Sequence, residues 1–254
     1  MSKITPALQL YTVRDLTRTD FAGTVKQVAA IGYRYVELAG FGNLKTAAEV
    51  RDALGEAGLK LAAAHAGIEQ LEKELDKVLD EQEILGNRTI VCPYMPEPRR
   101  KDAAGWRKCA ADLSRIGQQC RRRGFELAYH NHSFEFQVFD GVSGLDLLWQ
   151  HSDPQLVRAE LDVYWVTHGG GDPVSYIEKL GSRILLLHLK DMAAGPERRF
   201  AEVGAGILDF KAILAAAERQ GIRWGVVEQD NCYGTPPLEA ARKSLENLQR
   251  LGVG

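Results

Sequence analysis

The sequence contains few cysteines, no long apolar run and no large excess of either charge, and each absence excludes a class of protein. The four cysteines form no CxxC pair, which favours reduced thiols over disulfides or a thiolate metal site. No apolar segment approaches the roughly 18 residues that a membrane-spanning helix needs. The N-terminus lacks the apolar stretch and small-residue cleavage site of a signal peptide. A cytoplasmic protein without a membrane partner is therefore expected.

The charge balance is close to neutral, with 32 lysines and arginines against 34 aspartates and glutamates, and a formal net charge of −2. Proteins that bind nucleic acid usually carry a basic face, so no nucleic-acid partner is expected. Hydrophobic residues make up 45% of the chain and charged residues 26%, which is typical of a soluble globular protein with a real core. The length of 254 residues suits one large domain or two small ones, so the order of the elements has to decide.

Short apolar runs alternate with segments of helical periodicity along the chain. The expected strands are 8–13, 33–38, 59–65, 88–92, the start of 125–136, 157–162, 183–189 and 224–229. The expected helices are 22–31, 46–58, 68–85, 102–122, 142–150, 173–180, 209–220 and 237–251. This alternation predicts an α/β protein with a parallel sheet, and no linker rich in proline, glycine or serine divides it. Eight such units in 254 residues favour a single (β/α)8 TIM barrel domain over residues 1–254, rather than an open doubly wound sheet.

Polar side chains interrupt the expected strands near their C-terminal ends, which is where barrels of this type carry their active sites. These residues are Glu37, His65, His130, His132, Asp162, His188, Lys190 and Glu228. Because strand side chains alternate, His130 shares a face with His132, and His188 with Lys190. A lone histidine in such a place is more often a hydrogen-bonded core residue. Strands five to eight, however, each end in a residue able to bind a metal, and this favours one common site.

Two imidazoles and two carboxylates suit a divalent transition-metal ion, and His130, Asp162, His188 and Glu228 are the candidate ligands. Nitrogen and oxygen ligands without thiolate fit one Mn²⁺, Co²⁺, Zn²⁺ or Fe²⁺ ion, and Mg²⁺ less well because of the histidines. Such an ion can hold a hydroxy-carbonyl pair of a substrate. It can also stabilise the enediolate formed when a proton leaves the carbon beside the carbonyl.

At these residues the chain resembles a known family, the sugar phosphate isomerase/epimerase group of xylose isomerase-like TIM barrels. The group also contains inosose dehydratases, ketose 3-epimerases and the type IV AP endonucleases. The most specific segments are Tyr129-His-Asn-His-Ser-Phe-Glu-Phe136, Glu160-Leu-Asp-Val-Tyr-Trp165, His188-Leu-Lys-Asp191 and Val203-Gly-Ala-Gly-Ile-Leu-Asp209. The resemblance implies metal ligands on strands five to eight, at the four positions named above. It also leaves a homo-oligomer open, since relatives are often dimers or tetramers.

The strand-five ligand departs from the family pattern, because many relatives have a glutamate where this chain has His130. A histidine can coordinate the ion as well. The competing ligand is Glu126, which lies on the same face but about 13 Å deeper along the strand. That depth makes Glu126 a poor partner for the other three ligands, so His130 is preferred.

The departure bears on the reaction. The related 3-epimerases use two opposed metal-bound glutamates as an acid/base pair, and an imidazole cannot copy that role directly. Glu228 remains the candidate base, and its candidate partners are His132, Glu135 and Lys190. A base opposed by a cationic or neutral acid suits elimination, and some relatives with the Tyr-His-Asn-His stretch resemble lyases or hydratases of 3-keto-sugars and 3-keto-glycosides. Isomerisation or epimerisation and elimination from a keto-sugar therefore both stay open.

A small-molecule sugar or keto-sugar is the expected partner, and its candidate contacts are Glu37, His65, Tyr94, Trp165 and Arg198. Tyr94 and Trp165 suit stacking against a sugar face, and Arg198 could grip a phosphate or carboxylate. Two other functions are weighed. Phosphodiester cleavage of the AP-endonuclease type is disfavoured because Trp165 stands where that resemblance calls for a histidine. The other is a barrel that binds sugar without catalysis.

Overall fold

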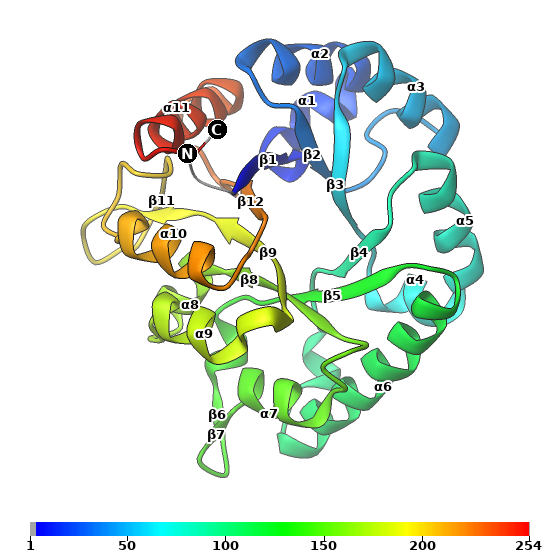
Figure 1. Ribbon diagram of the computed structural model, residues 1–254, viewed down its shortest axis with the longest axis vertical. Helices are drawn as coiled ribbons and strands as arrows, with labels where there is room; N and C mark the ends of the chain where they lie inside the picture. The colour runs from blue at the N-terminus through cyan, green and yellow to red at the C-terminus, as the bar shows by residue number, and fades with distance from the viewer. Residues whose placement is uncertain (1–3, 254) are drawn as a thin grey trace.

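The computed structural model describes residues 4–253, and in this part of the chain eight parallel strands close into a barrel (Figure 1). The barrel strands are β1 (Thr5–Gln9), β2 (Tyr35–Leu38), β3 (Lys60–His65), β4 (Thr89–Cys92), β5 (Glu126–His130), β8 (Arg158–Asp162), β9 (Ile184–Leu189) and β12 (Trp224–Val227). Each of them pairs with its predecessor and successor, and β12 closes the circle against β1. The TIM barrel expected from the sequence is confirmed.

Helices cover the outside of the barrel (Figure 1). The longer ones are α2 (Phe21–Ile31), α3 (Ala47–Ala57), α5 (Leu75–Leu85), α6 (Ala103–Arg122), α7 (Gly144–His151), α9 (Pro173–Leu180), α10 (Phe210–Arg219) and α11 (Pro237–Arg250). Polar side chains fix several starting points, because they accept hydrogen bonds from backbone N–H groups that the first turn leaves free. Thr46 and Glu49 form a capping box at α3, and Asp102 and Asp209 cap α6 and α10.

Shorter elements lie in the connections. They are the helices α1 (Arg14–Thr19), α4 (Ile68–Lys73) and α8 (Val163–His168), the 3-10 turns η1 (Leu10–Val13), η2 (Glu97–Arg99), η3 (Phe134–Phe136) and η4 (Gly181–Arg183), and the two-stranded pairs β6 (Val138–Phe139) with β7 (Val142–Ser143) and β10 (Asp191–Met192) with β11 (Phe200–Ala201). Within residues 4–253, no helix combines the length and the apolar character needed to cross a membrane.

Two expected elements are wrong in their bounds. The first strand was expected over 8–13, but β1 ends at Gln9 and residues 10–13 turn into η1. The side-chain Oε1 of Gln9 accepts a hydrogen bond from the N–H of Tyr11 (3.1 Å), which supports this turn. The single helix expected over 68–85 is divided into α4 and α5, because Glu74 between them has a non-helical φ of −134°.

A small apolar cluster fills the inside of the barrel, apart from the larger core that includes the helices. It consists of Ala7, Ala62, Ala63, Val91, Ala128, Leu186 and Val226. Two residues further along five of the strands stand Gln9, His65, His130, His188 and Glu228. Since strand side chains alternate with a period of two, these polar side chains form the next layer, toward the C-terminal end of the barrel.

Candidate active site and metal centre

The four predicted metal ligands meet at the C-terminal ends of their strands. His130 and Asp162 end β5 and β8, His188 lies on β9, and Glu228 directly follows β12. One donor atom from each lies within 4.8 Å of those of the other three, and all four side chains are buried. His188 Nδ1 is 3.0 Å from Glu228 Oε2, and His130 Nε2 is 3.9 Å from Asp162 Oδ2. We call these residues the mouth cluster; its role as a metal site stays a prediction.

A lysine reaches into the mouth cluster. The ammonium Nζ of Lys190 is 2.6 Å from Glu228 Oε2, 3.3 Å from Asp162 Oδ2 and 3.0 Å from Asp230 Oδ1. The lysine side chain is only 2% exposed, so these carboxylates are its main source of charge compensation. The ammonium thus contacts the same two carboxylate oxygens that a metal ion in the mouth cluster would use.

The charges of this group stabilise one another. Burial by itself lowers the pKa of Lys190, but Glu228, Asp162 and Asp230 outweigh burial and hold that pKa well above its ordinary value. Burial would raise the pKa of Glu228, yet Lys190 and His188 hold it below its ordinary value. For Asp162, burial prevails over the attraction of Lys190 and raises the pKa to about 6. Lys190 is therefore a cation and Glu228 a carboxylate at neutral pH.

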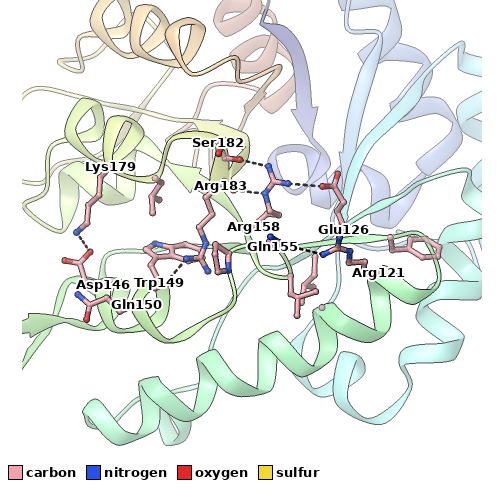
Figure 2. Close-up of a pocket in the computed structure, with 16 residues that line it drawn as sticks. Arg121, Glu126, Asp146, Trp149, Gln150, Gln155, Arg158, Lys179, Ser182 and Arg183 are labelled. Atoms are coloured by element: carbon pink, nitrogen blue, oxygen red, sulfur yellow. Dashed lines mark hydrogen bonds and ion pairs between the residues drawn. The ribbon is translucent and has the colours of Figure 1, made fainter.

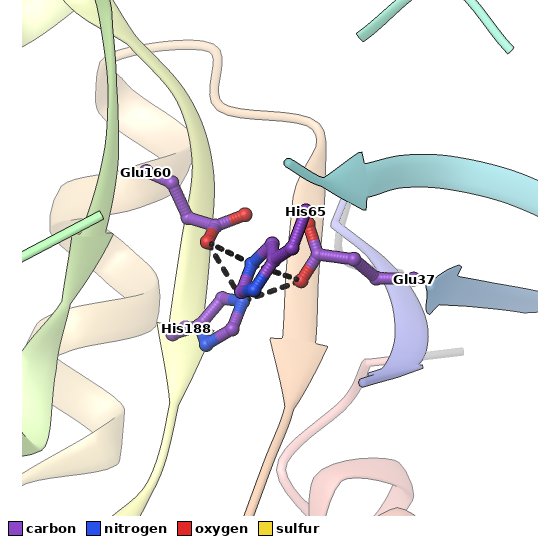
Figure 3. A group of neighbouring side chains, drawn as sticks. All are labelled: Glu37, His65, Glu160 and His188. Atoms are coloured by element: carbon purple, nitrogen blue, oxygen red, sulfur yellow. Dashed lines mark hydrogen bonds and ion pairs between the residues drawn. The ribbon is translucent and has the colours of Figure 1, made fainter. Parts of the chain in front are cut away.

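A second group of donors, drawn in Figure 3, shares His188 with the mouth cluster. Glu37 lies on β2, His65 ends β3, and Glu160 precedes Asp162 by two residues on β8. His188 Nε2 is 2.7 Å from Glu37 Oε2 and 3.0 Å from Glu160 Oε2. His65 Nε2 is 3.3 Å and 3.1 Å from the same two oxygens. We call Glu37, His65, Glu160 and His188 the deep cluster.

Glu160 was not among the site residues expected from the sequence. Glu37 and His65 were expected to contact a substrate, and the structure places both against Glu160 and His188. Glu37 is fully buried and bonded to histidines rather than open to a substrate, and its pKa is a balance of opposing effects. Burial raises that pKa, but the charges of His65 and His188 bring it well below its ordinary value. The signal for Glu160 was present, because a residue two before Asp162 on a strand must share its face.

His132 and Glu135 both follow β5, but only His132 lines the cavity, whereas Glu135 is buried in hydrogen bonds. Burial, assisted by the charge of Lys190, lowers the pKa of His132 to about 3, so its imidazole is neutral at physiological pH. Glu135 is fully buried, and it accepts hydrogen bonds from the Tyr129 hydroxyl (2.7 Å) and the His132 backbone N–H (2.9 Å). Glu135 therefore positions the segment that carries His132 and does not line the cavity described next.

A cavity of about 350 Å³ opens above these groups. Its lining residues are Tyr11, Ala39, His65, Pro93, Tyr94, His130, His132, Lys190, Glu228 and Asp230. Of the expected substrate contacts, Tyr94 and His65 line it. Trp165 is not among the lining residues, but its ring centroid is 5.5 Å from that of His132, which is. Arg198 is exposed on the loop between β10 and β11, and its Nη1 donates a hydrogen bond to the His168 carbonyl (3.0 Å). The structure therefore does not bring Arg198 to the cavity.

A larger hollow of about 870 Å³ lies at the opposite end of the barrel, among the starts of β5, β8 and β9 (Figure 2). Its cationic groups are already paired: Arg158 contacts Glu126 (3.2 Å), and Arg183 donates to the carbonyls of Val157, Trp149 and Ser152. Glu126, whose side chain is half exposed, belongs to this end. It lies away from Asp162, His188 and Glu228, so it cannot replace His130 in the mouth cluster.

A comparison of the sequence with known protein families identifies the same kind of barrel. The family described as "Xylose isomerase-like TIM barrel" matches residues 25–251. The chain belongs to this family. The match begins within α2 and runs past the end of α11, so it includes seven of the eight barrel strands and leaves out β1.

This xylose isomerase-like barrel is similar in sequence or in structure to several known proteins. An inosose dehydratase from Geobacillus kaustophilus is 26% identical over 269 residues, covering 89% of this chain and 86% of that protein. Further inosose dehydratases match over only about half of their own length. A solved sugar phosphate isomerase/epimerase from Parabacteroides distasonis has a TM-score of 0.84 at 24% identity, covering 98% of this chain and 94% of that one. The IolI protein, solved with a zinc atom, has a TM-score of 0.78 at 14% identity, covering 98% of both chains.

The donors of this xylose isomerase-like barrel fit a divalent ion in kind and in burial. Imidazole nitrogens and carboxylate oxygens are the ligands that Zn²⁺ and related ions take in proteins. Asp162 Oδ2 is buried and accepts no hydrogen bond within residues 4–253, so a donor atom remains for an ion there. The opposing feature is Lys190, which holds a positive charge against the same carboxylates.

Proposed function

We propose that the chain removes the proton beside the carbonyl of a sugar or keto-sugar and then eliminates a neighbouring hydroxyl or alkoxyl group. The arrangement of charge around the cavity carries the proposal. Its two lining carboxylates, Glu228 and Asp230, both follow β12 and both contact Lys190. The lining imidazoles of His130 and His132 come from the end of β5, and burial keeps the pKa of each well below its ordinary value. Beside these two carboxylates the cavity thus has the Lys190 cation and two neutral imidazoles, while Glu37 raises the pKa of the third lining imidazole, His65, to about 10.

Each of these groups has a step to perform. Glu228 accepts the proton from carbon, and the Lys190 ammonium stabilises the negative charge that develops on the carbonyl oxygen. The carboxylic acid formed at Glu228 then returns the proton to the leaving hydroxyl, so water departs and a carbon–carbon double bond forms. One carboxyl group therefore serves first as base and then as acid. No second carboxylate on the other face of the substrate is needed, which suits a chain with histidine at position 130.

Two further considerations support the proposal. The relative from Geobacillus kaustophilus is named for the dehydration of an inosose, which is a keto-sugar reaction of this kind. The mouth cluster also offers ligands for a divalent ion, which when bound would supply additional stabilisation of negative charge on a substrate oxygen. A metal-assisted enzyme with a small keto-sugar substrate is therefore the function that we propose.

The test is a proton NMR screen of inososes, 3-keto-glycosides, aldoses and ketoses with the purified protein in D₂O. We expect an unsaturated product from a keto-sugar, and we expect Glu228→Gln to lower kcat by about 10²–10⁴-fold. The matched control is Glu83→Gln, which changes a surface carboxylate paired with Arg88 and Arg123 and should leave kcat unchanged. Full activity in Glu228→Gln, or no conversion of any keto-sugar by the wild-type protein, would refute the proposal.

Isomerisation or epimerisation is the second candidate, and one observation favours it. His132 lines the same cavity as Glu228, and its Nδ1 has no hydrogen-bond partner in the described residues, so its neutral ring is a candidate second group for proton exchange. The same NMR experiment separates the two reactions. Epimerisation introduces deuterium at the reacting carbon and retains the hydroxyl group, whereas elimination releases it as water.

A further inference from the structure

We infer that the deep cluster of Glu37, His65, Glu160 and His188 binds one divalent transition-metal ion, at a position separate from the mouth cluster. The four donor atoms alternate around a ring in which each imidazole Nε2 contacts both carboxylate oxygens (Figure 3). The four nitrogen–oxygen distances lie between 2.7 and 3.3 Å. The inference goes beyond the proposed function, because Glu37, His65 and Glu160 take no part in that reaction.

A count of protons shows why hydrogen bonds alone leave this ring incomplete. Each imidazole Nε2 carries at most one proton, and an ionised carboxylate carries none. Two protons therefore have to serve four short contacts, and good hydrogen-bond angles allow each proton only one strong acceptor. A cation at the centre attracts all four donors at once. Zn²⁺ binds imidazole nitrogen and carboxylate oxygen at about 2.0–2.2 Å, which in a tetrahedron separates neighbouring donors by about 3.3–3.6 Å.

The surroundings of the deep cluster resemble the support that metal ligands receive in proteins. A metal-binding histidine usually donates its other ring N–H to a carboxylate or carbonyl group. In His188, Nε2 faces the deep cluster while Nδ1 lies 3.0 Å from Glu228 Oε2. The Gln9 amide nitrogen donates to Glu37 Oε2 (2.7 Å), and Gln9 is itself oriented because its Oε1 accepts from the Tyr11 N–H. Both partners hold their ligand in the orientation that an ion needs.

Two buried carboxylate oxygens of the deep cluster have no hydrogen-bond partner among the described residues. They are Glu37 Oε1 and Glu160 Oε1, and both side chains are 0% exposed. Leaving ionised oxygens buried and unpaired is costly unless a positive charge lies close by. In the mouth cluster Lys190 supplies that charge. Among the described residues, the cationic partners of Glu37 and Glu160 are histidines, which contact the Oε2 atoms, and no lysine or arginine pairs with either carboxylate. The Oε1 atoms of Glu37 and Glu160 are therefore available to an ion in the deep cluster.

The test measures metal content and affinity in the full-length protein and does not depend on turnover. Elemental analysis gives the number of ions per chain, and competition with a chromophoric chelator gives the Kd for Zn²⁺. His65→Asn and Glu160→Gln each remove a donor found only in the deep cluster. Each should remove one ion per chain and raise the Kd for Zn²⁺. Losing a residue that only hydrogen-bonds to a ligand weakens metal binding by about 10–100-fold, and losing a ligand itself should weaken it more.

Two variants act as controls. Asp162→Asn removes a donor found only in the mouth cluster and should leave the deep ion in place. Glu135→Gln alters a carboxylate that is equally buried but belongs to neither cluster, and should also leave the metal content unchanged. Wild-type metal content in both His65→Asn and Glu160→Gln would overturn the inference. Loss of the ion only in Asp162→Asn would also overturn it, while leaving the proposed reaction intact.

A spectroscopic measurement covers the case in which a deep-cluster variant does not fold. Co²⁺ added to metal-free wild-type protein shifts the NMR signals of the imidazoles that coordinate it. His65 belongs to the deep cluster and not to the mouth cluster, so we expect its ring signals to shift strongly with those of His188. An unshifted His65 beside a shifted His130 would contradict the inference, and so would a protein that binds neither Co²⁺ nor Zn²⁺.

Discussion

Replacing Lys190 by methionine should destabilise the protein strongly, because it removes the ammonium group that contacts three carboxylates. Lys190 Nζ contacts Glu228, Asp162 and Asp230 at 2.6–3.3 Å, and the side chains of Glu228 and Asp162 are at most 5% exposed. Methionine has a similar length but carries no charge, so packing is largely kept while the carboxylates lose their partner. Removing one member of a buried ion pair costs about 3–5 kcal/mol. In a protein of this size that corresponds to a fall in Tm of about 6–20 °C.

Urea unfolding and thermal unfolding at pH 7, in the presence of a chelator, measure this effect. Lys26→Met is the matched control, since Lys26 contacts Glu56 at 3.0 Å but both side chains are more than half exposed. An exposed pair of this kind contributes about 0–1 kcal/mol. If Lys190→Met destabilises the protein no more than Lys26→Met, the carboxylates do not depend on the ammonium and the account of the mouth cluster is wrong.

Three further predictions follow from local features. Burial raises the pKa of Glu135 to about 7 from 4.5, so the folded protein favours the protonated carboxyl group. The stabilisation that Glu135 contributes to the free energy of unfolding is therefore fully present below pH 4.5 and is lost as the pH rises through 7. The unfolding free energy of Glu135→Gln should therefore improve relative to wild type by about 3 kcal/mol between pH 4.5 and pH 8, and parallel pH profiles would contradict this. Thr46→Ala breaks the capping box of α3 and should cost about 1 kcal/mol in urea unfolding, whereas Thr46→Ser should cost little. Chelation of bound metal should lower Tm, and Zn²⁺ at about 1,000 times its Kd should raise the free energy of unfolding of the metal-free protein by about 4 kcal/mol. A Tm that does not change when Zn²⁺ is added would contradict a metal centre.

The barrel was predictable because its signals are local and repeated. Each barrel strand is a short apolar run, and alternation with helices of periodic pattern leaves few arrangements other than a parallel sheet. The convergence of His130, Asp162, His188 and Glu228 followed from the same rule, since the C-terminal ends of all strands face one side. The division of the segment 68–85 was not predictable, because Glu74 is an ordinary helix-forming residue.

The details of the site depend on register, and register was not visible in the sequence. Glu160 lies two residues before Asp162 on the face that points into the barrel, but its closeness to Glu37 and His65 depends on the register of strands that are distant in sequence. The competition between Lys190 and a metal ion was also hidden, because it depends on three distances to side chains from β8 and β12. The homo-oligomer and the cytoplasmic location stay predictions.

The histidine at position 130 has a structural counterpart in Glu160. The two residues stand directly opposite in the register of β5 and β8, and His130 Nδ1 lies 3.0 Å from Glu160 Oε2. A glutamate at position 130 would set two buried carboxylates against each other. We therefore expect His130→Glu to cost about 3–5 kcal/mol.

A double-mutant cycle tests this pairing. Glu160→Gln should make His130→Glu less harmful, because the glutamine amide can donate a hydrogen bond to the new carboxylate. The coupling energy from urea unfolding of wild type, both single variants and the double variant should favour the double variant by about 0.5–3 kcal/mol. All four proteins are measured with a chelator, so that bound ions do not mask the repulsion. Additive effects within about 0.5 kcal/mol would mean that the two positions do not compensate each other, and that the histidine has another cause.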